Sequence, residues 1–264
     1  MISYMRNILL TISYDGTDFH GWQRQDSADK NKPVRTVQGE IEKALEKIHK
    51  QSINLFGSGR TDSGVHAFAQ AANFFSPIDS IPAEKYIPAL NSFLPYDIRI
   101  MEAKIVPDDF NARFSATSRT YRYFFHTKNP LASQMRFVWP IYHRPELAVL
   151  NEMASFMKNE IDCASFAASG DQSISTCRYI KKAHFYYDEK DNDILVFEIT
   201  ANAFLWKMVR SLAGTFISFE KNGKSPEYFK KVLDSKNRSM AGPTAPPTGL
   251  FLYKIDFDGT RIHI

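Results

Sequence analysis

The stretch Leu55-Phe56-Gly57-Ser58-Gly59-Arg60-Thr61-Asp62-Ser63-Gly64-Val65-His66-Ala67 places one arginine and one aspartate among three glycines, between two apolar runs. Glycine permits backbone angles and close approaches that a side chain would block. A carboxylate held in such a loop can meet a ligand at the protein surface. A tight turn in which Asp62 only bonds nearby backbone amides would use the same residue types. The rest of the chain has to decide between these two interpretations.

The composition is typical of a globular protein with one or two domains, since 44% of the 264 residues are hydrophobic and 23% are charged. Cys163 and Cys177 are too few for a disulfide framework and form no metal-type pair, so we expect free thiols in a reducing cytoplasm. There is no long apolar run for a membrane span, and the first residues do not resemble a signal peptide. The seven histidines are scattered, so no metal site is expected.

Positive charge is unevenly distributed along this chain of net charge +4. Residues 110–145 contain no Asp or Glu. The same segment carries these cations: Arg113, Arg119, Arg122, Lys128, Arg136 and Arg144. Aromatic residues lie between them, and cations follow phosphates while aromatic faces stack on bases. The segment therefore has two interpretations: a surface that faces nucleic acid, or a β-rich segment with core aromatics and solvated arginines.

Hydrophobic periodicity predicts a regular order of elements in the first half. We expect strands over 8–14, 53–56, 65–75 and 98–106, and helices over 37–48 and 83–94. Thr36 is a suitable N-cap for the first helix. In the strand expected over residues 65–75, small residues from Val65 onward alternate with larger ones. The small residues would lie on one face of the strand, which suggests close packing against a helix. The order β-α-β-β-α-β is the split βαβ arrangement of ferredoxin-like domains.

The second half repeats this order with additional helices. We expect strands over 120–126, 178–187, 193–200 and 250–257, and helices over 145–158, 202–219 and 226–233. Lys207 and Arg210 would then share one face of an apolar helix. Arg210 would either pair with a carboxylate inside the protein or extend to solvent. The predicted fold is α/β (α+β), with two ferredoxin-like-derived halves, 1–113 and 114–264, whose mixed or antiparallel sheets are flanked by helices and join to leave a central cleft.

Five motifs in one order carry a family resemblance. They are Tyr14-Asp15-Gly16-Thr17-x-Phe19-x-Gly21-Trp22-Gln23 with Thr36-Val37-Gln38-Gly39-Glu40, the Gly59–Ala67 part of the loop, Arg119-Thr120-Tyr121-Arg122-Tyr123, Asn202-Ala203-Phe204-Leu205-Trp206-x-Met208-Val209-Arg210, and Ala245-Pro246-Pro247-x-Gly249-Leu250. Together they resemble the tRNA pseudouridine synthases of the TruA family over residues 9–257. A lone Gly-Arg-Thr-Asp would be weakly specific, whereas five collinear motifs are highly specific.

The resemblance implies isomerisation of uridine to pseudouridine at positions 38, 39 and 40 of the tRNA anticodon stem-loop. Asp62 is then the catalytic carboxylate, acting as a nucleophile at C1′ of the ribose or as a base at C2′. Tyr121 is expected to stack on the uracil and to take part in proton transfer. Arg210 is expected to pair with Asp62, keeping it ionised and aimed. Arg60 is a candidate to fill the space of the flipped nucleotide.

The resemblance also implies partners. Leu250 or Leu252 would line the apolar side of the uracil pocket. RNA contacts are expected from Arg119, Arg122, Lys128 and Arg136. Family members are homodimers with one tRNA across both subunits, and an isomerisation requires no cofactor, metal or external donor. The resemblance therefore implies a cytoplasmic, tRNA-binding homodimer without a cofactor.

Two segments depart from the family pattern: the charged loop 26–34 and the tail 258–264, neither of which includes a predicted catalytic residue. Three alternatives remain open. The first is an RNA-binding protein that has lost the chemistry, against which intact Asp62, Tyr121 and Arg210 argue. The second is a hydrolase with a second carboxylate near Asp62, and residues 57–75 contain no other acid. The third is a related enzyme that modifies other RNA positions.

Overall fold

The computed structural model describes residues 5–25 and 34–262. Most of the charged loop at residues 26–34 and the last two residues of the tail lie outside this range. The chain forms two compact units. Unit 1 comprises Met1–Ala116 and Leu252–Asp258, and unit 2 comprises Thr117–Phe251 and Gly259–Ile264. The division expected after residue 113 thus falls after Ala116, and most of the last strand belongs to unit 1 rather than to the C-terminal half.

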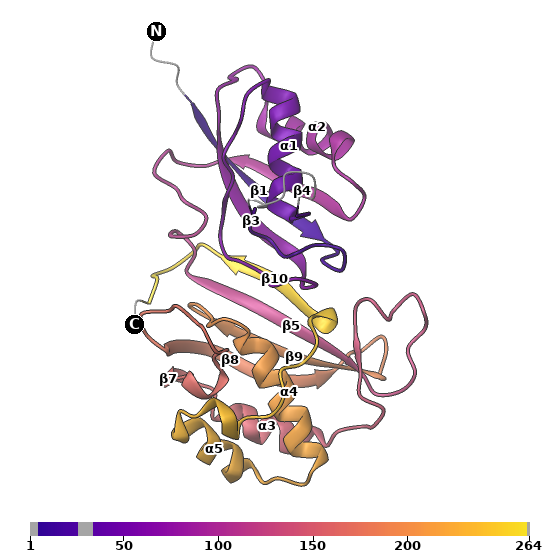
Figure 1. The fold of residues 1–264 in the computed structure, drawn as a ribbon. Coiled ribbons are helices and arrows are strands. Elements are labelled where there is room, and N and C mark those ends of the chain that lie inside the picture. The colour runs from indigo at the N-terminus through magenta and orange to yellow at the C-terminus, as the bar shows by residue number, and fades with distance from the viewer. Residues whose placement is uncertain (1–4, 26–33, 263–264) are drawn as a thin grey trace. The chain divides into compact units, whose positions relative to one another are not determined.

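Unit 1 has the expected order of strands and helices (Figure 1). Its elements are β1 (Arg6–Tyr14), α1 (Val37–His49), β2 (Phe56–Gly57), β3 (His66–Ser76), α2 (Tyr86–Phe93) and β4 (Ile98–Ile105). The strands are ordered β4-β1-β3, each pair antiparallel, and β2 pairs with β3. The predicted β-α-β-β-α-β order is therefore confirmed.

Helix α1 forms where the sequence predicted it. The Thr36 hydroxyl accepts a hydrogen bond from the Gly39 N–H at 3.3 Å, which satisfies one of the open donors of the first turn. Val37, Ile41 and Leu45 are fully buried, because their spacing places them on one face of the helix. The N-cap and the apolar stripe were both correctly predicted from local sequence.

The strand predicted over residues 53–56 is wrong, since only Phe56–Gly57 are in β2. Side chains of α1 take the backbone groups that a strand partner would use. The Leu55 N–H donates to Glu42 Oε1 at 3.1 Å, and the Leu55 carbonyl accepts from Gln38 Nε2 at 3.0 Å. The apolar pattern of residues 53–56 predicts a strand, but hydrogen bonds to side chains of α1 hold Leu55 against that helix instead.

Both faces of the central strands of unit 1 are covered. Ile8, Leu10 and Ile12 are fully buried on one face of β1. Leu9 on the opposite face forms a small apolar cluster with Ala71, with residues that follow β4, and with residues at the end of β10 (Leu250–Asp256) or just after it: Val106, Phe110, Ala112, Ile255 and Phe257. This double burial explains why β1 reads as a nearly continuous apolar run rather than as a strict alternation.

A buried polar cluster lies within unit 1 at the end of α1. His49 Nε2 lies 3.0 Å from the Tyr86 hydroxyl and 3.3 Å from Ser76 Oγ, and the two hydroxyls are 2.7 Å apart. Burial lowers the pKa of His49, and the hydrogen bond with the Leu45 carbonyl opposes this effect only in part. The cluster therefore holds a neutral imidazole in the folded protein.

We expect the stability of the protein to fall in acid partly through His49. Because the folded state disfavours the protonated ring, the unfolded chain binds more protons once the pH falls below the ordinary pKa of histidine, about 6.5. The contribution of His49 is complete above that pH and is lost as the pH falls from there through the lower pKa of the folded state. Urea denaturation at about pH 7.5 and pH 5 should show a larger loss of midpoint for the wild type than for His49→Gln. Equal losses would contradict this role of His49.

Unit 2 combines further strands with three helices (Figure 1). Its strands are β5 (Ser118–His126), β6 (Trp139–Pro140), β7 (Asn159–Asp162), β8 (Cys177–Tyr187) and β9 (Ile194–Ala201), and its helices are α3 (Leu147–Ser155), α4 (Met208–Lys221) and α5 (Pro226–Ser235). The order β5-β9-β8-β7 is antiparallel, and β6 runs parallel to β5. The core contains a chain of rings in contact, stacked except for the edge-to-face pair of Phe185 with Phe216: Phe197, Phe185, Phe216, Phe229 and Phe166. The predicted mixed α/β class is confirmed.

The helix predicted over residues 202–219 is wrong in its first part, because α4 begins at Met208. The side-chain oxygen of Asn202 accepts from the N–H groups of Tyr179 and Ala203 at 3.0 and 2.8 Å, which holds the segment before the helix in an irregular conformation. Lys207 is the N-cap residue and adopts left-handed angles, with φ 58°. Lys207 and Arg210 therefore do not share a helix face, contrary to the prediction.

The two cysteines are free thiols, as predicted. Cys163 is fully buried, and this burial raises its pKa to about 12. A thiol with so high a pKa carries almost no thiolate at neutral pH and is chemically inert. Among the described residues, no helix combines the length and the apolar character that crossing a membrane requires.

Candidate functional site: the Asp62 loop and the late motifs

The loop that carries Asp62 connects β2 to β3 in unit 1, and its first half is fixed to β3. The Ser58 N–H donates to the Ala71 carbonyl at 2.8 Å, and Ser58 Oγ donates to Gln70 Oε1 at 2.7 Å. Gln70 Nε2 in turn donates to the Gly59 carbonyl at 3.0 Å. Gln70 is fully buried. Its amide therefore acts as a clamp that ties both loop residues to the strand.

Gln70 is a supporting residue that the sequence reasoning did not single out. The sequence does contain a signal for this role, because the long polar side chain of Gln70 lies between alanines in β3. A buried amide is costly unless its donors and acceptors are bonded. A long polar side chain within such a strand is thus a marker of a neighbouring loop that needs support.

The opening motif of the chain supports the loop on both sides of Asp62. The Thr61 hydroxyl lies 2.8 Å from the Tyr14 hydroxyl, and the Thr61 carbonyl accepts from the Trp22 N–H at 3.2 Å. Ser63 Oγ donates to the Phe19 carbonyl at 3.1 Å. Residues 61 and 63 are therefore anchored to one motif. Asp62 between them is half-buried, and the anchors on both sides hold its backbone in a defined place.

Arg60 lies exposed on the same loop, two residues before Asp62. Its Nε donates to Gln23 Oε1 at 3.3 Å, and Gln23 Nε2 donates to Gln38 Oε1 at 2.8 Å. These bonds connect the loop to the start of α1. The structure therefore brings the predicted residues Arg60 and Asp62 together on one supported loop. Leu252, which was predicted to line the uracil pocket, is buried in β10.

In unit 2, two of the late motifs meet at β5. The rings of Tyr121 and Phe204 pack edge to face, with centroids 5.1 Å apart and planes at 86°. Arg119 Nη1 donates to the Asn202 carbonyl at 2.9 Å, and Arg119 is almost fully buried. Arg119 therefore fixes the segment that carries Phe204, and Phe204 in turn supports the ring of Tyr121.

The third late motif joins the other two around Arg210. Arg210 Nε donates to the Ala245 carbonyl at 2.8 Å, and the Ala245 N–H donates to the Arg210 carbonyl at 3.0 Å. The Tyr123 hydroxyl donates to the Pro246 carbonyl at 2.7 Å. Burial raises the pKa of Tyr123 well above its ordinary value, and the positive charge of Arg210 only partly opposes this shift. Leu250, the last residue of the motif, is buried.

The predicted RNA-contacting cations differ in their surroundings. Arg122 Nε lies 2.7 Å from Glu198 Oε2 on the neighbouring strand, and Lys182 Nζ lies 3.1 Å from Glu198 Oε1. Burial alone would raise the pKa of Glu198, but the hydrogen bonds from Arg122 and Lys182 outweigh it and lower the pKa. Lys128 pairs with Asp193 at 3.0 Å but is largely exposed, and Arg136 is exposed.

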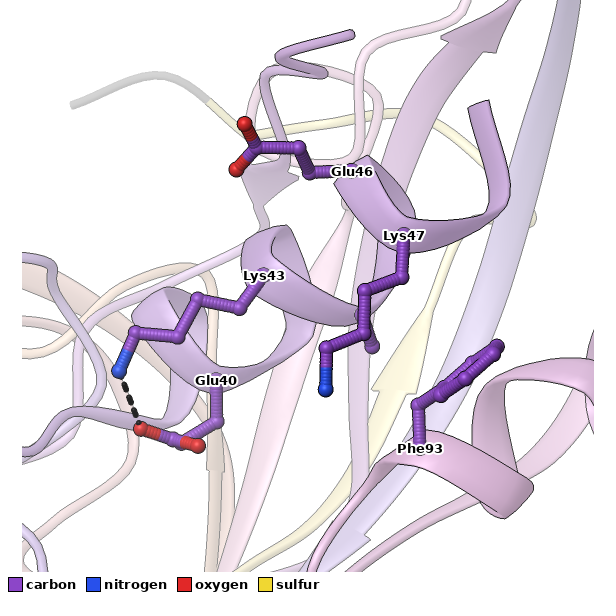
Figure 2. A pocket seen from close by; sticks show the side chains of 6 residues that line it. Glu40, Lys43, Glu46, Lys47 and Phe93 are labelled. Carbon is purple, nitrogen blue, oxygen red and sulfur yellow. Dashed lines mark hydrogen bonds and ion pairs between the residues drawn. The ribbon is translucent and has the colours of Figure 1, made fainter. Parts of the chain in front are cut away.

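A shallow surface pocket lies elsewhere in unit 1, between α1 and the end of α2 (Figure 2). It is lined by Glu40, Lys43, Ala44, Glu46, Lys47 and Phe93. Lys43 and Glu40 form an ion pair at 2.8 Å, and Lys47 lies over the ring of Phe93 at 5.4 Å from its centroid. The pocket has two acids and two lysines and contains none of the predicted site residues.

Comparisons with known proteins agree with the motifs. A sequence profile of tRNA pseudouridine synthases matches residues 10–115 and 160–258. The tRNA pseudouridine synthase A of Treponema denticola is 56% identical over 96% of this chain and 93% of its own length. The enzymes of the same name from Treponema pallidum strain Nichols and Caldicellulosiruptor saccharolyticus are 50% and 42% identical over 90% and 95% of this chain, and over 84% and 99% of their own lengths.

These matches, together with the mixed α/β fold, define the class of the protein as a pseudouridine synthase, which is an isomerase. Within that class, the chain belongs to the tRNA pseudouridine synthase A family.

Proposed function

We propose that this protein isomerises uridine to pseudouridine in tRNA, at positions 38, 39 and 40 of the anticodon stem-loop. The observation that carries the proposal is the 56% identity to a tRNA pseudouridine synthase A over nearly the whole chain, with the Asp62 loop intact. The specific positions rest on the resemblance of the five motifs to the bacterial enzymes.

The reaction breaks the bond from C1′ of the ribose to N1 of uracil and forms a bond from C1′ to C5. In one route the carboxylate of Asp62 attacks C1′, uracil leaves with the electron pair, turns, and attacks C1′ through C5 while the carboxylate departs. In the other route Asp62 removes the C2′ proton while uracil leaves C1′ with the electron pair, which gives a glycal; C5 then adds to C1′ and the proton returns to C2′. In both routes the C5 proton is lost at the end. No electrons are gained or lost, so the proposal includes no cofactor.

The other predicted residues then receive roles. Tyr121 stacks on the target uracil and assists the final proton transfer, and Phe204 holds its ring in place. Arg210 pairs with the Asp62 carboxylate, with its Nε already fixed by the Ala245 carbonyl. Arg60 occupies the position of the base that leaves the stack. Leu250 and Leu252 provide apolar surface for the uracil ring.

We assign the phosphate contacts to the exposed cations Lys128 and Arg136. Arg119 is almost fully buried against Asn202 and Arg122 is partly buried beside Glu198, so both are less accessible to a phosphate than the two exposed cations. Arg136→Ala should weaken tRNA binding and lower the slope of log Kd against log salt by about 1, because a phosphate contact releases about one counterion. Arg122→Ala is the matched comparison and should leave the slope unchanged. Filter binding at several salt concentrations measures both. An unchanged slope for Arg136→Ala would remove this residue from the RNA-facing surface.

The proposal includes a cytoplasmic homodimer, as the family resemblance implies. Light scattering of the purified protein tests the oligomeric state directly.

The function is tested by mapping pseudouridine on unmodified tRNA transcripts after incubation with the purified protein alone. New pseudouridine at positions 38, 39 or 40 supports the whole proposal. Signal only at other positions keeps the reaction and overturns the assignment of the positions. Binding of tRNA without any pseudouridine overturns the enzymatic proposal in favour of an RNA-binding protein.

A further inference from the structure

The three tryptophans of the chain differ in exposure. Trp22 is almost fully buried, Trp139 is partly buried, and Trp206 in unit 2 is 45% exposed. Scattered exposed apolar residues are common on protein surfaces, so exposure by itself carries no argument. Trp206 is distinguished by how its backbone is held, by the charge beside its ring, and by its place in the chain.

The backbone of Trp206 is fixed by the segment that follows β7. Its carbonyl accepts from the Ala168 N–H at 3.0 Å, and its N–H donates to Oδ2 of Asp171. Burial alone would raise the pKa of Asp171, but hydrogen bonds from Ser173 and from the Trp206 N–H lower it, so this acceptor stays ionised. A Cβ built on Gly170 would lie 3.7 Å from the indole, so the ring also lies beside this segment. The exposed ring is therefore presented on a fixed support, which lowers the entropy lost when a ligand binds.

A positive charge accompanies the ring. Lys207 adopts left-handed backbone angles, with φ 58°, which are uncommon for a residue with a side chain. Its Nζ lies 4.5 Å from the centroid of the Trp206 ring, although consecutive side chains of a regular helix or strand do not face each other. Backbone strain of this kind clusters at sites that bind ligands. The strained residue here is the one whose ammonium group lies over the indole.

Trp206 belongs to the segment that supports Tyr121. Phe204, two residues earlier, packs against the ring of Tyr121 with centroids 5.1 Å apart. The Met208 N–H donates to the Leu205 carbonyl at 3.1 Å, so the chain makes a tight turn between Phe204 and α4. One end of this turn therefore contacts the ring that is expected to stack on the target uracil, while Trp206 within the turn is open to solvent.

We propose that Trp206 is a stacking platform for an unpaired base of the tRNA other than the target uracil, and that Lys207 contacts a phosphate beside that base. Every base has a flat aromatic face, and an exposed ring beside a cation is the combination that binds single-stranded nucleic acid. The base stacks on the indole face that Lys207 leaves open. The inference rests on the proposed action on tRNA, and it gives a role to Trp206, for which the family resemblance implied none.

Ring variants separate stacking from apolar packing. Trp206→Leu keeps an apolar side chain but removes the flat ring, so the Kd for tRNA should rise by about 5-fold or more. Trp206→Phe keeps a ring, and its Kd should stay within about threefold of the wild type. Tyr228→Leu is the matched control, because Tyr228 in α5 also has a lysine over its ring, Lys224 at 4.8 Å from the centroid, and it should leave the Kd unchanged. Filter binding with unmodified tRNA transcripts measures all three.

Tryptophan fluorescence of the full-length protein tests the contact without relying on the folding of Trp206→Leu. Acrylamide quenches exposed tryptophans, so Trp206 should dominate the quenching of the free protein. Bound tRNA should protect Trp206 from acrylamide, and Trp206→Phe should lack the protected signal. An RNA duplex without unpaired bases should bind through its phosphates and leave Trp206 accessible. Lys207→Gln should lower the slope of log Kd against log salt by about 1, and an unchanged slope would overturn the phosphate contact of Lys207.

The outcomes are separable. Unchanged access of acrylamide to Trp206 in the tRNA complex overturns the platform, as do equal losses of affinity in Trp206→Leu and Trp206→Phe, or protection by the fully paired duplex. Pseudouridine formation by the wild type is measured on the same transcripts. Pseudouridine without protection of Trp206 overturns only the platform, and protection without pseudouridine overturns only the proposed reaction. Absence of any tRNA binding overturns both.

Discussion

Asp62→Ala should lower the rate of pseudouridine formation by at least about 10³-fold, because it removes the group that acts on the ribose. The Kd for tRNA should change by no more than about twofold, since phosphate contacts supply most of the affinity. Ser58, Thr61 and Ser63 anchor the loop through bonds that the substitution leaves in place, so we expect the loop to keep its conformation. Single-turnover assays and filter binding with the same transcripts measure the two quantities.

The control for this experiment has to separate charge from chemistry. Asp79→Asn removes one negative charge from an exposed side chain of unit 1 that lies 3.6 Å from Arg6, and it should leave turnover unchanged. Asp62→Asn keeps the size of the side chain and should be as inactive as the alanine variant. Turnover of Asp62→Asn within about tenfold of the wild type would exclude Asp62 as nucleophile and base.

Gly16→Ala should have the second-largest effect, although Gly16 is not a predicted site residue. A Cβ at this position would lie 1.9 Å from the carbonyl oxygen of Val65 and 2.5 Å from its carbonyl carbon. Both atoms belong to the backbone just after the Asp62 loop, so they cannot move aside as a flexible side chain would. We expect a loss of about 1–3 kcal/mol in the free energy of unfolding. Turnover should fall by about 10- to 100-fold, because displacement of the loop misplaces the carboxylate.

Gly59→Ala is the matched variant within the Asp62 loop. No atom lies within 4 Å of a Cβ built on Gly59, so the same chemical change should leave stability nearly unchanged. Urea denaturation and single-turnover assays of both variants give the comparison. If Gly16→Ala and Gly59→Ala are equally stable and equally active, the close approach of residue 16 to Val65 does not position the loop.

The comparison between Gly16 and Gly59 shows a difference between two residues that the sequence alone does not reveal. Both glycines belong to motifs, and the sequence gives no reason to rank one above the other. The structure ranks them, because Gly16 meets a backbone 49 residues further along the chain while Gly59 faces open space. Close approach between distant segments leaves no local pattern, so it cannot be predicted from periodicity or turn statistics.

The errors in predicted elements have the same origin. An apolar run was read as a strand at residues 53–56, and another as a helix at residues 202–207. In the first case Gln38 and Glu42 of α1 take the backbone groups of Leu55. In the second case Asn202 is tied to Tyr179 and Arg119. Side chains from elsewhere in the fold thus replaced the local hydrogen bonds that the propensities favoured.

The predicted charge surface was also refined by tertiary contacts. Six cations in an acid-free segment look equivalent in the sequence. In the structure Arg122 of β5 lies opposite Glu198 of the adjacent strand β9, and Arg119 is buried against Asn202. The absence of acids within a segment therefore does not predict whether its cations form ion pairs, because the acidic partners lie on neighbouring strands.

The sequence by itself determined the order of elements in unit 1, the N-cap of α1 at Thr36, the free thiols and the family, because these depend on local periodicity, capping and contiguous motifs. Only the tertiary structure decided that the three late motifs meet around Arg119, Arg210 and Tyr123, and that Gln70 clamps the Asp62 loop. The bond from Tyr123 to Pro246 spans 123 residues. Hydrogen bonds and packing of that range depend on how whole sheets and helices fold together, and no local window of sequence contains them.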